Sequence, residues 1–545
     1  MLFSALFSSF PEIPDDFVPG RISRREHFAF RRDVLKADPE ILSIIADGYR
    51  VPFKNGVLPP PSFEPNNRSA LDHSDFLLQE LLRWEKIGCT TLVHERPRIV
   101  LPVSVVFSNK WRAVVDASRS VNPYVSKNSV VLDSLSSVSE VIQSGDWMTK
   151  QDLSAGYHHI MIHPEYRTLF GVHYVFPSGE VMYWHWNVLF LGERNAVHLF
   201  TKILRPHRNF LAAMGVRHRL YIDDFLIVSS NCLKCLSDTQ KHLEALFLAG
   251  WVVKPAKCIN HPAQKMTFLG LDVDSTKLSF FVPVGKRALI LDQIQRVLMA
   301  DFVPVRSLAS LYGQLIAVSL AIGPVIRMLT RFGFAVINSA SSWNQLVFVS
   351  YKCKLELGFV ARNFDELNGH SFSRAVPQLA ISSTFFASDA SGVGLGTIEL
   401  TGEGGFILVQ QLAFSKEDMS KSSTFRELKA FHLCYTNLEL LSRLANQRVK
   451  HFTDNYNLVN MFKIGSKRSH LHSLLFDIFL NLKMFNITLE VVWLPRSDPT
   501  MVVADYFSRD LDTTDYGISE KAFAALATAW GLLRWTLLRL TQTHA

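Results

Sequence analysis

Apolar residues recur at helical spacing in several long segments, and shorter apolar runs lie between them. In residues 71–87 the apolar positions repeat every three or four residues, which predicts a helix. The same pattern predicts helices over 132–144, 196–214, 233–249 and most of 286–330. Runs rich in β-branched and aromatic residues predict strands over 99–107, 111–115, 147–153, 172–176, 181–186, 218–221 and 225–228. Helices and strands therefore alternate without a fixed period, which predicts an α+β chain.

The pattern changes near residue 384. Residues 385–400 predict two strands around a glycine-rich turn, and 424–444 predict a helix. Strands are then expected over 449–453 and 489–493, with a last helix starting at 501. At roughly 150 residues per domain, 545 residues suggest three to four domains. We divide the chain into five parts. They are a loop-rich N-terminal extension (1–70), a first unit (71–280), a helical part (281–375), a second unit (380–510) and a helical tail (511–545).

Composition narrows the class of protein. The chain is 48% apolar and 12% aromatic, which excludes a disordered protein. Lys and Arg exceed Asp and Glu by 57 − 49 = 8, so a polyanionic partner fits the charge. Six cysteines in 545 residues are too sparse for a disulfide scaffold. We expect an intracellular, reducing compartment, and no signal peptide because the apolar start lacks a basic region and soon meets acidic residues.

Two segments have alternative interpretations. The uncharged window 307–326 has the length of a membrane span, but it contains polar residues, two glycines and a proline between Arg306 and Arg327. A buried helix in a protein without a membrane partner is the preferred interpretation. The spacing of four other residues can be written as a zinc site, or as a connection plus a small core residue; these are Cys232, Cys235, Cys258 and His261.

Three acidic residues lie at the ends of predicted strands. Asp152 ends an apolar strand, and Asp223 and Asp224 lie near the tip of a hairpin. Neighbouring strands can bring such carboxylates close together, where only cations offset their repulsion. Oxygen ligands favour Mg²⁺, and a pair of such ions can activate a hydroxyl and stabilise leaving pyrophosphate. The alternative is turn chemistry, because Asp is common in hairpin turns.

These acids lie within strings that resemble the reverse transcriptases of retroelements, in order and spacing, from Trp84 to Asp272. The matching strings are Tyr221-Ile222-Asp223-Asp224, Lys150-Gln151-Asp152-Leu153-Ser154-Ala155-Gly156-Tyr157, Lys110-Trp111-Arg112-Ala113-Val114-Val115-Asp116 with Arg119 and Asn122, Trp186-Asn187-Val188-Leu189 with Gly192, Ala196 and Phe200, and Gly250-Trp251 followed by Lys257-Cys258 and Phe268-Leu269-Gly270.

The resemblance implies a right-hand polymerase of fingers, palm and thumb, with RNA and DNA template-primer and deoxynucleoside triphosphates as partners. It implies two Mg²⁺ ions, or Mn²⁺, on Asp152, Asp223 and Asp224. Further residues would bind substrate, namely Lys110, Arg112, Tyr157, Gly192 and Lys257, and others would grip the primer, namely Phe268, Leu269 and Gly270. Residues 281–375 would be thumb and connection.

Some positions depart from the family pattern. The family's Pro-Phe-Gly-Leu core reads Phe190-Leu191-Gly192-Glu193, and the fingers turn 108–110 lacks the usual lysine tip. The residue that holds the triphosphate is therefore open, with Arg112 first and Lys110 second. Tyr157 would exclude a 2′-hydroxyl, as the aromatic residue at this place does in the family, whereas a core aromatic is the alternative.

A second set of acids follows in the last unit, each at the end of an expected element. The order of Asp389, Glu427, Asp454 and Asp505 resembles ribonuclease H over 384–510, which implies an α/β domain with two-metal cleavage of RNA in hybrids. Four unrelated surface acids are the alternative. The histidine that usually precedes the last aspartate is absent, and the stretch reads Trp493-Leu494-Pro495-Arg496-Ser497-Asp498.

The ordering of further strings is similar to the tyrosine-recombinase (DIRS-like) retrotransposons. They include Ala504-Asp505-Tyr506-Phe507-Ser508-Arg509 and Phe200-Thr201-Lys202-Ile203-Leu204-Arg205-Pro206. The sequence therefore predicts a retrotransposon reverse transcriptase with ribonuclease H activity. A catalytically dead nucleic-acid-binding remnant is the alternative, and the seven acids argue against it.

Overall fold

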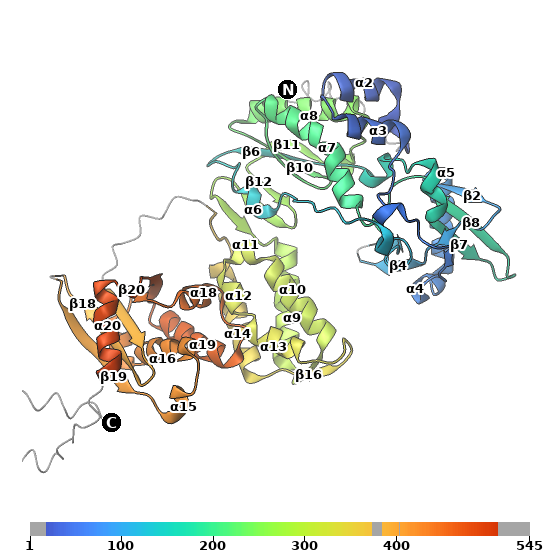
Figure 1. Ribbon diagram of the computed structural model, residues 1–545. Helices are drawn as coiled ribbons and strands as arrows, with labels where there is room; N and C mark the ends of the chain where they lie inside the picture. Colours follow the sequence, from blue (N-terminus) through green and yellow to red (C-terminus); the bar gives the residue numbers. More distant parts are fainter. Residues whose placement is uncertain (1–17, 109, 373–383, 403, 511–545) are drawn as a thin grey trace, which may run out of the picture. The chain divides into compact units, whose positions relative to one another are not determined.

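The computed structural model describes residues 18–108, 110–372, 384–402 and 404–510, and it is drawn in Figure 1. The chain forms two compact units, Met1–Phe280 and Phe281–Ala545, each with helices and sheets. A mixed α+β, multidomain fold is confirmed. The finer division into five segments stays a prediction, and the expected helical tail, 511–545, lies outside the described residues.

Among its described residues, the first unit contains four sheets. The five-stranded sheet has the order β1-β3-β7-β8-β2 and the four-stranded sheet the order β11-β6-β10-β9, while β12-β13-β14 and β4-β5 form smaller ones. The strands are β1 (Ser62–Phe63), β2 (Thr90–Val93), β3 (Ile99–Val100), β4 (Val103–Phe107), β5 (Trp111–Val115), β6 (Trp147–Asp152), β7 (Gly171–Val175), β8 (Val181–Trp186), β9 (Arg217–Tyr221), β10 (Asp224–Ser229), β11 (Ile259–Ala263), β12 (Lys265–Phe268), β13 (Leu271–Asp274) and β14 (Ser279–Phe281).

Helices α7 and α8 pack along the four-stranded sheet (Figure 1), and one large apolar core fills this unit. The helices of the unit are α2 (Arg25–Asp33), α3 (Pro39–Asp47), α4 (Arg68–Leu71), α5 (Ser74–Lys86), α6 (Leu135–Val138), α7 (Ala196–Ala213) and α8 (Cys232–Leu248). Apolar strands such as β10, in which Phe225 to Val228 are all at 0% exposure, lie in the close-packed interior of the unit.

The described part of the N-terminal extension, from residue 18 on, is more helical than predicted, because 25–47 contains α2 and α3. The fully buried side chain of Arg31 connects helix α2 to the residue that follows α8, 218 positions later in the sequence. Its Nε and Nη2 atoms donate to the carbonyl oxygen of Ala249 at 3.1 and 2.9 Å, and its guanidinium lies 5.0 Å from the ring of Trp251. The loop-rich prediction was therefore wrong for this segment.

Two other predicted elements were wrong in extent. The helix expected over 132–144 is reduced to α6, where Ser134 and Ser137 form a capping box; serines compete for backbone hydrogen bonds and shorten helices. The strand expected over 99–107 is broken into β3 and β4 at Pro102, which has no N–H to donate to a ladder.

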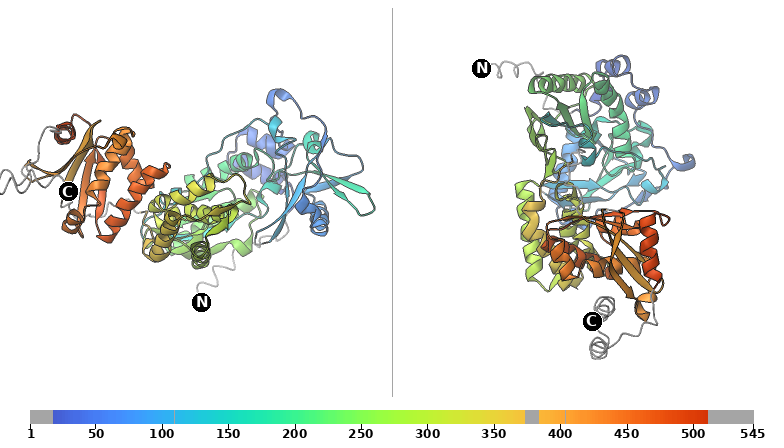
Figure 2. Two further views of the ribbon diagram at one scale, coloured as in Figure 1. Left: turned by 90° about the horizontal axis from the view of Figure 1, so that it is seen from below. Right: turned by 90° about the vertical axis from the view of Figure 1, so that its left-hand side faces the viewer.

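The second unit combines a helical part with a five-stranded sheet of order β19-β18-β17-β20-β21 (Figure 2). Its strands are β15 (Phe302–Pro304), β16 (Leu346–Phe348), β17 (Thr384–Ala390), β18 (Gly394–Leu400), β19 (Phe406–Ala413), β20 (Arg448–Thr453) and β21 (Thr488–Trp493). Its helices are α9 (Val284–Met299), α10 (Val305–Ala317), α11 (Ser319–Ile322), α12 (Val325–Met328), α13 (Arg331–Asn338), α14 (Tyr351–Leu367), α15 (Lys416–Met419), α16 (Ser423–Cys434), α17 (Leu438–Arg443), α18 (Tyr456–Ile464), α19 (Ser469–Met484) and α20 (Pro499–Arg509).

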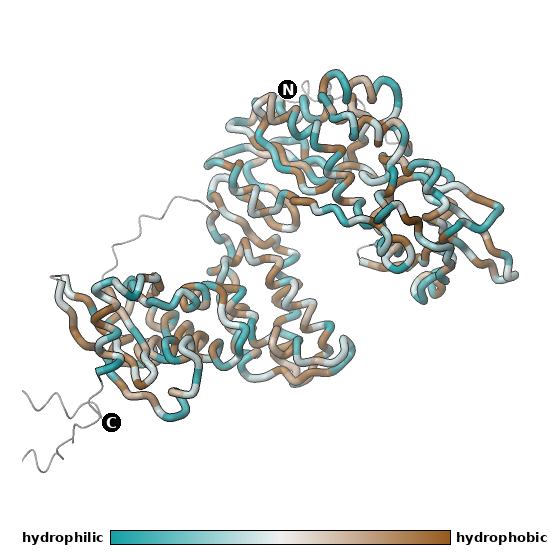
Figure 3. The backbone as a smooth tube through the Cα atoms, viewed as in Figure 1, coloured by the Kyte–Doolittle hydropathy of each residue, from teal (hydrophilic) through white to brown (hydrophobic). Residues whose placement is uncertain are grey.

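Helix α16 packs on β17 and β18 and on α19, and α20 also packs on β17 and β18. The helix predicted over 424–444 is divided into α16 and α17, because Asn437 caps a new helix by accepting from the N–H of Leu440. The window 307–326 is likewise divided among α10, α11 and α12. Hydrophobic and hydrophilic stretches alternate along these helices (Figure 3), and none of the described helices is long and apolar enough to cross a membrane.

Candidate active sites

Asp152, Asp223 and Asp224 lie together at one end of the four-stranded sheet. Asp152 is the last residue of β6 and Asp224 the first of β10, and antiparallel pairing places the two opposite each other. Asp223 lies in the turn between β9 and β10, after Ile222, whose φ of 55° is in the left-handed region. The carbonyl oxygen of Asp223 accepts from the N–H of Leu153 at 3.2 Å, which ties the turn to the end of β6.

Two lysines form ion pairs with two of these three carboxylates. Lys257 Nζ donates to Asp152 Oδ2 at 2.8 Å and to Oδ1 at 3.1 Å, while Lys150 Nζ lies 3.0 Å from Asp224 Oδ1. Burial raises the pKa of Asp223, and the nearby charge of Asp152 raises it further. The site is therefore two ion pairs around a half-buried carboxylate, an oxygen donor set that suits a hard divalent cation.

Tyr157 lies beside these acids in a short 3₁₀ helix, Gly156–His159. Its ring centroid is 5.1 Å from that of Phe200. Burial, followed by the charges of Asp223 and Tyr221, raises the pKa of the phenol to about 12. The side chain is half-buried, and exclusion of a 2′-hydroxyl stays a prediction, with a core aromatic as the alternative.

The remaining predicted substrate residues lie on hairpins and loops of the first unit. Lys110 precedes β5, and Arg112 lies on β5 opposite Val106. Gly192 lies so close to the end of β5 that a Cβ atom added to it would be 2.2 Å from the carbonyl oxygen of Val115. The carbonyl oxygen of Gly192 accepts a hydrogen bond from Asn122 Nδ2 at 3.0 Å.

The predicted primer grip forms the turn between β12 and β13. Phe268 is buried, and Leu269 and Gly270 have φ values of 47° and 82°. Lys150 Nζ lies 5.9 Å from the centroid of the Phe268 ring. This turn therefore borders the ion pair of Lys150 and Asp224.

The cysteines give no support to zinc binding. Cys235 Sγ donates to the carbonyl of Trp147 at 3.4 Å, and Cys258 Sγ to that of Lys254 at 3.3 Å. Within the described ranges, no group of three metal-binding side chains includes Cys232, Cys235, Cys258 or His261. The alternative to zinc was wrong in placing Cys232 and Cys235 in a connection, because both lie in α8, while Cys258 is half-buried against the apolar core.

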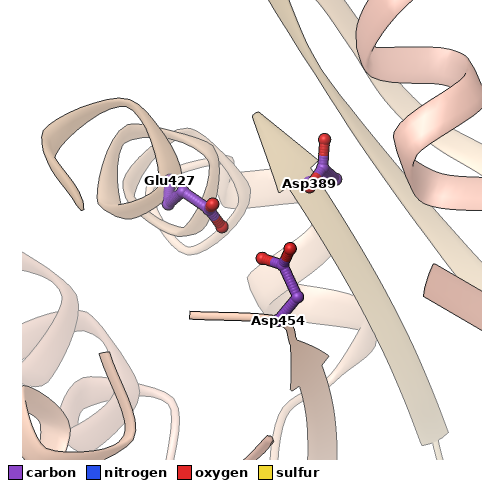
Figure 4. Close-up of side chains that lie close together, drawn as sticks. All are labelled: Asp389, Glu427 and Asp454. Atoms are coloured by element: carbon purple, nitrogen blue, oxygen red, sulfur yellow. The ribbon is translucent and has the colours of Figure 1, made fainter. Parts of the chain in front are cut away.

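In the second unit, Asp389, Glu427 and Asp454 converge (Figure 4). They come from β17, from α16 and from the residue after β20, and each offers a ligand atom within 4.8 Å of the others. The same register that pairs β17 with β20 in parallel brings Asp389 and Asp454 to one edge of the sheet. We refer to these three residues as the acidic triad.

Burial dominates the electrostatics of the triad. Glu427 is 5% exposed and Asp389 2%, and burial raises the pKa of both carboxyls; the neighbouring acids raise them further. Ser508 Oγ donates to Asp389 Oδ2 at 2.7 Å, which opposes part of that rise. Two buried acids that resist ionisation are suited to binding a divalent cation, which offsets both penalties.

Asp505 lies outside the triad, on α20, and is bonded to Arg509 at 2.8 and 2.9 Å. Arg496 Nε donates to Asp454 Oδ2 at 2.9 Å. The sequence strings contained Arg496, Ser508 and Lys150, yet we assigned them no role there. The apolar periodicity of helices and strands does not show which basic side chain contacts which acid in the folded chain. For this reason the sequence contained no signal for these contacts.

Comparisons with known proteins agree with part of this picture. A family model described as reverse transcriptase (RNA-dependent DNA polymerase) matches residues 97–273. No curated protein matches the chain.

Among solved structures, the foamy viral protease-reverse transcriptase in complex with RNA/DNA hybrid is similar at 16% identity and a TM-score of 0.49, over 87% of this chain. The present chain spans 63% of that chain's length. The same viral protein in a form with double-stranded DNA gives 16% identity and 0.48, over 90% of this chain and 85% of that one. The acids at the ends of β6 and β10 lie within residues 97–273, which match the family model of reverse transcriptases.

Proposed function

We propose that the chain is a reverse transcriptase that copies RNA and DNA templates and also cleaves RNA in RNA–DNA hybrids. The observation that carries the proposal is the position of Asp152, Asp223 and Asp224 within the matched domain, at the meeting ends of β6 and β10. We further propose a retrotransposon origin, in the DIRS-like group, from the sequence strings alone.

In the polymerase site, Asp152, Asp223 and Asp224 would hold two Mg²⁺ or Mn²⁺ ions. Bound ions would supply activation of the primer hydroxyl and stabilisation of the leaving pyrophosphate. Lys257 and Lys150 compensate the acids before loading. Tyr157 would limit the space beside the 2′ position of the incoming sugar, since its ring is fixed against Phe200.

Other parts of the first unit would position the substrates. Lys110 and Arg112 on the β4–β5 hairpin would bind the triphosphate, and Gly192 would let the backbone approach it. The turn at 268–270 would hold the primer end next to the acids. The basic balance of the chain suits contacts to the phosphates of the template-primer.

In the second unit, the acidic triad would hold the hydrolytic metal ions, with Asp505 as an outer ligand. Asp389 is positioned by Ser508, and Glu427 is fixed in the first turns of α16. Because these carboxyls are buried, water would compete less with them for a bound cation. A cation held in this way would favour attack on a bound phosphodiester. Residues 281–375 would serve as thumb and connection.

Primer extension tests the proposal. The full chain is incubated with a primed RNA template and deoxynucleotides, with Mg²⁺ or with a chelator. We expect extension only with Mg²⁺, and a loss of more than about a hundredfold in Asp223→Asn. Asp75→Asn, an exposed acid on α5, is the matched control. Absence of extension by the wild-type chain would favour the inactive, nucleic-acid-binding remnant.

A further inference from the structure

Arg496 occupies one oxygen of the acidic triad. Its Nε atom donates to Asp454 Oδ2 at 2.9 Å, from the loop between β21 and α20. The side chain of Asp454 is 10% exposed, whereas that of Arg496 is 66% exposed. The acid is therefore fixed in the site, while the cation reaches it from the solvent side.

A guanidinium and a metal ion require the same property of Asp454, which is a negatively charged oxygen with an available lone pair. Asp389 and Asp505 also attract the charge of Arg496, so its field extends over the whole group. A divalent ion that enters the triad meets this positive charge as well as an occupied oxygen. Charges a few ångströms apart at a partly wet site still interact strongly.

Arg509 differs from Arg496 in its bonding. It binds Asp505 through two hydrogen bonds, and Asp505 lies outside the triad. The two arginines thus separate into one that bonds a triad member and one that bonds the outlying acid. Competition for a triad oxygen involves Arg496.

We propose that Arg496 is a positioning residue that competes with the divalent ion for Asp454, and so sets the metal concentration at which the hydrolytic site fills. This inference rests on the proposed hydrolytic function. It assigns a role to the loop in which the family histidine is absent. Because the arginine side chain is long and exposed, it can leave Asp454 without any rearrangement of the sheet.

Metal-directed backbone cleavage tests the proposal separately from enzymatic activity. Fe²⁺ with ascorbate and peroxide is added to the full chain, and oxidative cuts form next to bound iron. Fe²⁺ is kept too dilute to saturate the site in any variant, Mg²⁺ is then titrated in, and the concentration that halves the cuts near residues 389 and 454 reports its affinity for the triad. Cuts near 152 and 224 differ in fragment size and serve as an internal control.

Arg496→Gln is expected to lower the protecting Mg²⁺ concentration at least about fivefold at 389 and 454, with no change at 152 and 224. Arg496→Lys keeps the charge and should stay within about twofold of wild type. Arg443→Gln removes an exposed arginine paired with Glu399 in the same unit, and should also match wild type.

An unchanged or higher Mg²⁺ midpoint in Arg496→Gln would overturn the proposal while leaving the hydrolytic function intact. A lower midpoint in Arg443→Gln as well would overturn it too, because the effect would then be one of general charge. Absence of cuts near 389 and 454 in every variant would overturn the hydrolytic function itself, and the inference with it.

Discussion

The carboxylates of the first unit and those of the second are held in different ways. In the first, Asp152 is paired with Lys257 and Asp224 with Lys150, whereas Asp223 is a half-buried acid whose pKa is raised by burial. In the second, two buried acids face one another and a single arginine bonds the third. In the sequence the two sets cannot be told apart in this respect, because both consist of acids at the ends of expected helices and strands.

The difference concerns where the repulsion between acids is offset. In the first unit lysines offset part of it, because Lys257 pairs with Asp152 and Lys150 with Asp224. In the second unit burial and mutual repulsion raise the pKa of Asp389 and Glu427, so their charged forms are disfavoured unless a cation binds. Two of the three acids of the first site are paired with lysines, whereas the second site depends more heavily on a bound cation.

The largest expected effect separates the two sites. Glu427→Gln should reduce release of RNA fragments from a labelled RNA–DNA hybrid more than about a hundredfold, because a triad ligand is lost. Primer extension should stay within about twofold. Asp223→Asn should do the reverse. Glu417→Gln, in the exposed helix α15, is the control for a lost acid, and a joint loss of both activities in either variant would contradict the separation.

Tyr157→Val is expected to admit ribonucleotides in the first unit without affecting the second. The smaller side chain removes the ring that rests on Phe200 beside Asp223, and discrimination should fall by about 2 kcal/mol, or roughly thirtyfold. The measurement is kcat/KM for a ribonucleotide relative to its deoxy form in primer extension. Tyr166→Val, another tyrosine of the same unit, is the comparison, and equal discrimination in the two would place the steric exclusion elsewhere.

Acid should weaken the first unit through its buried histidines. Burial lowers the pKa of His159 and His207 to about 3, below the usual 6.5. Below pH 6.5 the unfolded chain therefore binds protons that the folded unit cannot, and stability falls as pH falls towards 3. Each histidine should cost about 1.4 kcal/mol per pH unit.

Calorimetry between pH 7.5 and pH 5, in the presence of a chelator, measures this loss. The transition of the first unit should move to lower temperature, and His207→Gln should reduce the shift. An unfolding temperature that does not change with pH would contradict the burial of these side chains as neutral groups.

The smallest expected effect concerns Lys150. Lys150→Met removes the ammonium that competes for Asp224, so the Mg²⁺ concentration for half-maximal extension should fall about threefold. Lys150→Arg should restore the wild-type value. A rise in the Mg²⁺ requirement would show that the lysine positions Asp224 for the metal instead of competing with it.

Much of the local structure follows from the sequence pattern. The hairpin of β9 and β10 was expected from two apolar runs around Ile222 and Asp223, and β6 from the run that ends at Asp152. Apolar period and turn residues are local properties, and they determine where such elements end. The acids were found for this reason.

The rest depends on features that no local period contains. A capping asparagine at 437 divides a helix whose apolar pattern continues, and Lys257 reaches Asp152 across 105 positions of sequence. Helices α18 and α19 and strand β19 were not predicted at all. Strand β19 is an exposed edge with apolar residues on it, so its pattern lacks the buried run that marks β10.

The bond from Arg31 to Ala249 has a consequence for synthesis of the chain. The two residues are 218 positions apart, so a ribosome that adds 5–20 residues per second takes roughly 10 to 45 seconds to make the acceptor after the donor. During that time Trp251 has not yet been synthesised, so the guanidinium of Arg31 cannot pack on its ring and stays in water. Helix α2 therefore docks late, and the first unit reaches its final form only when almost all of it has left the ribosome.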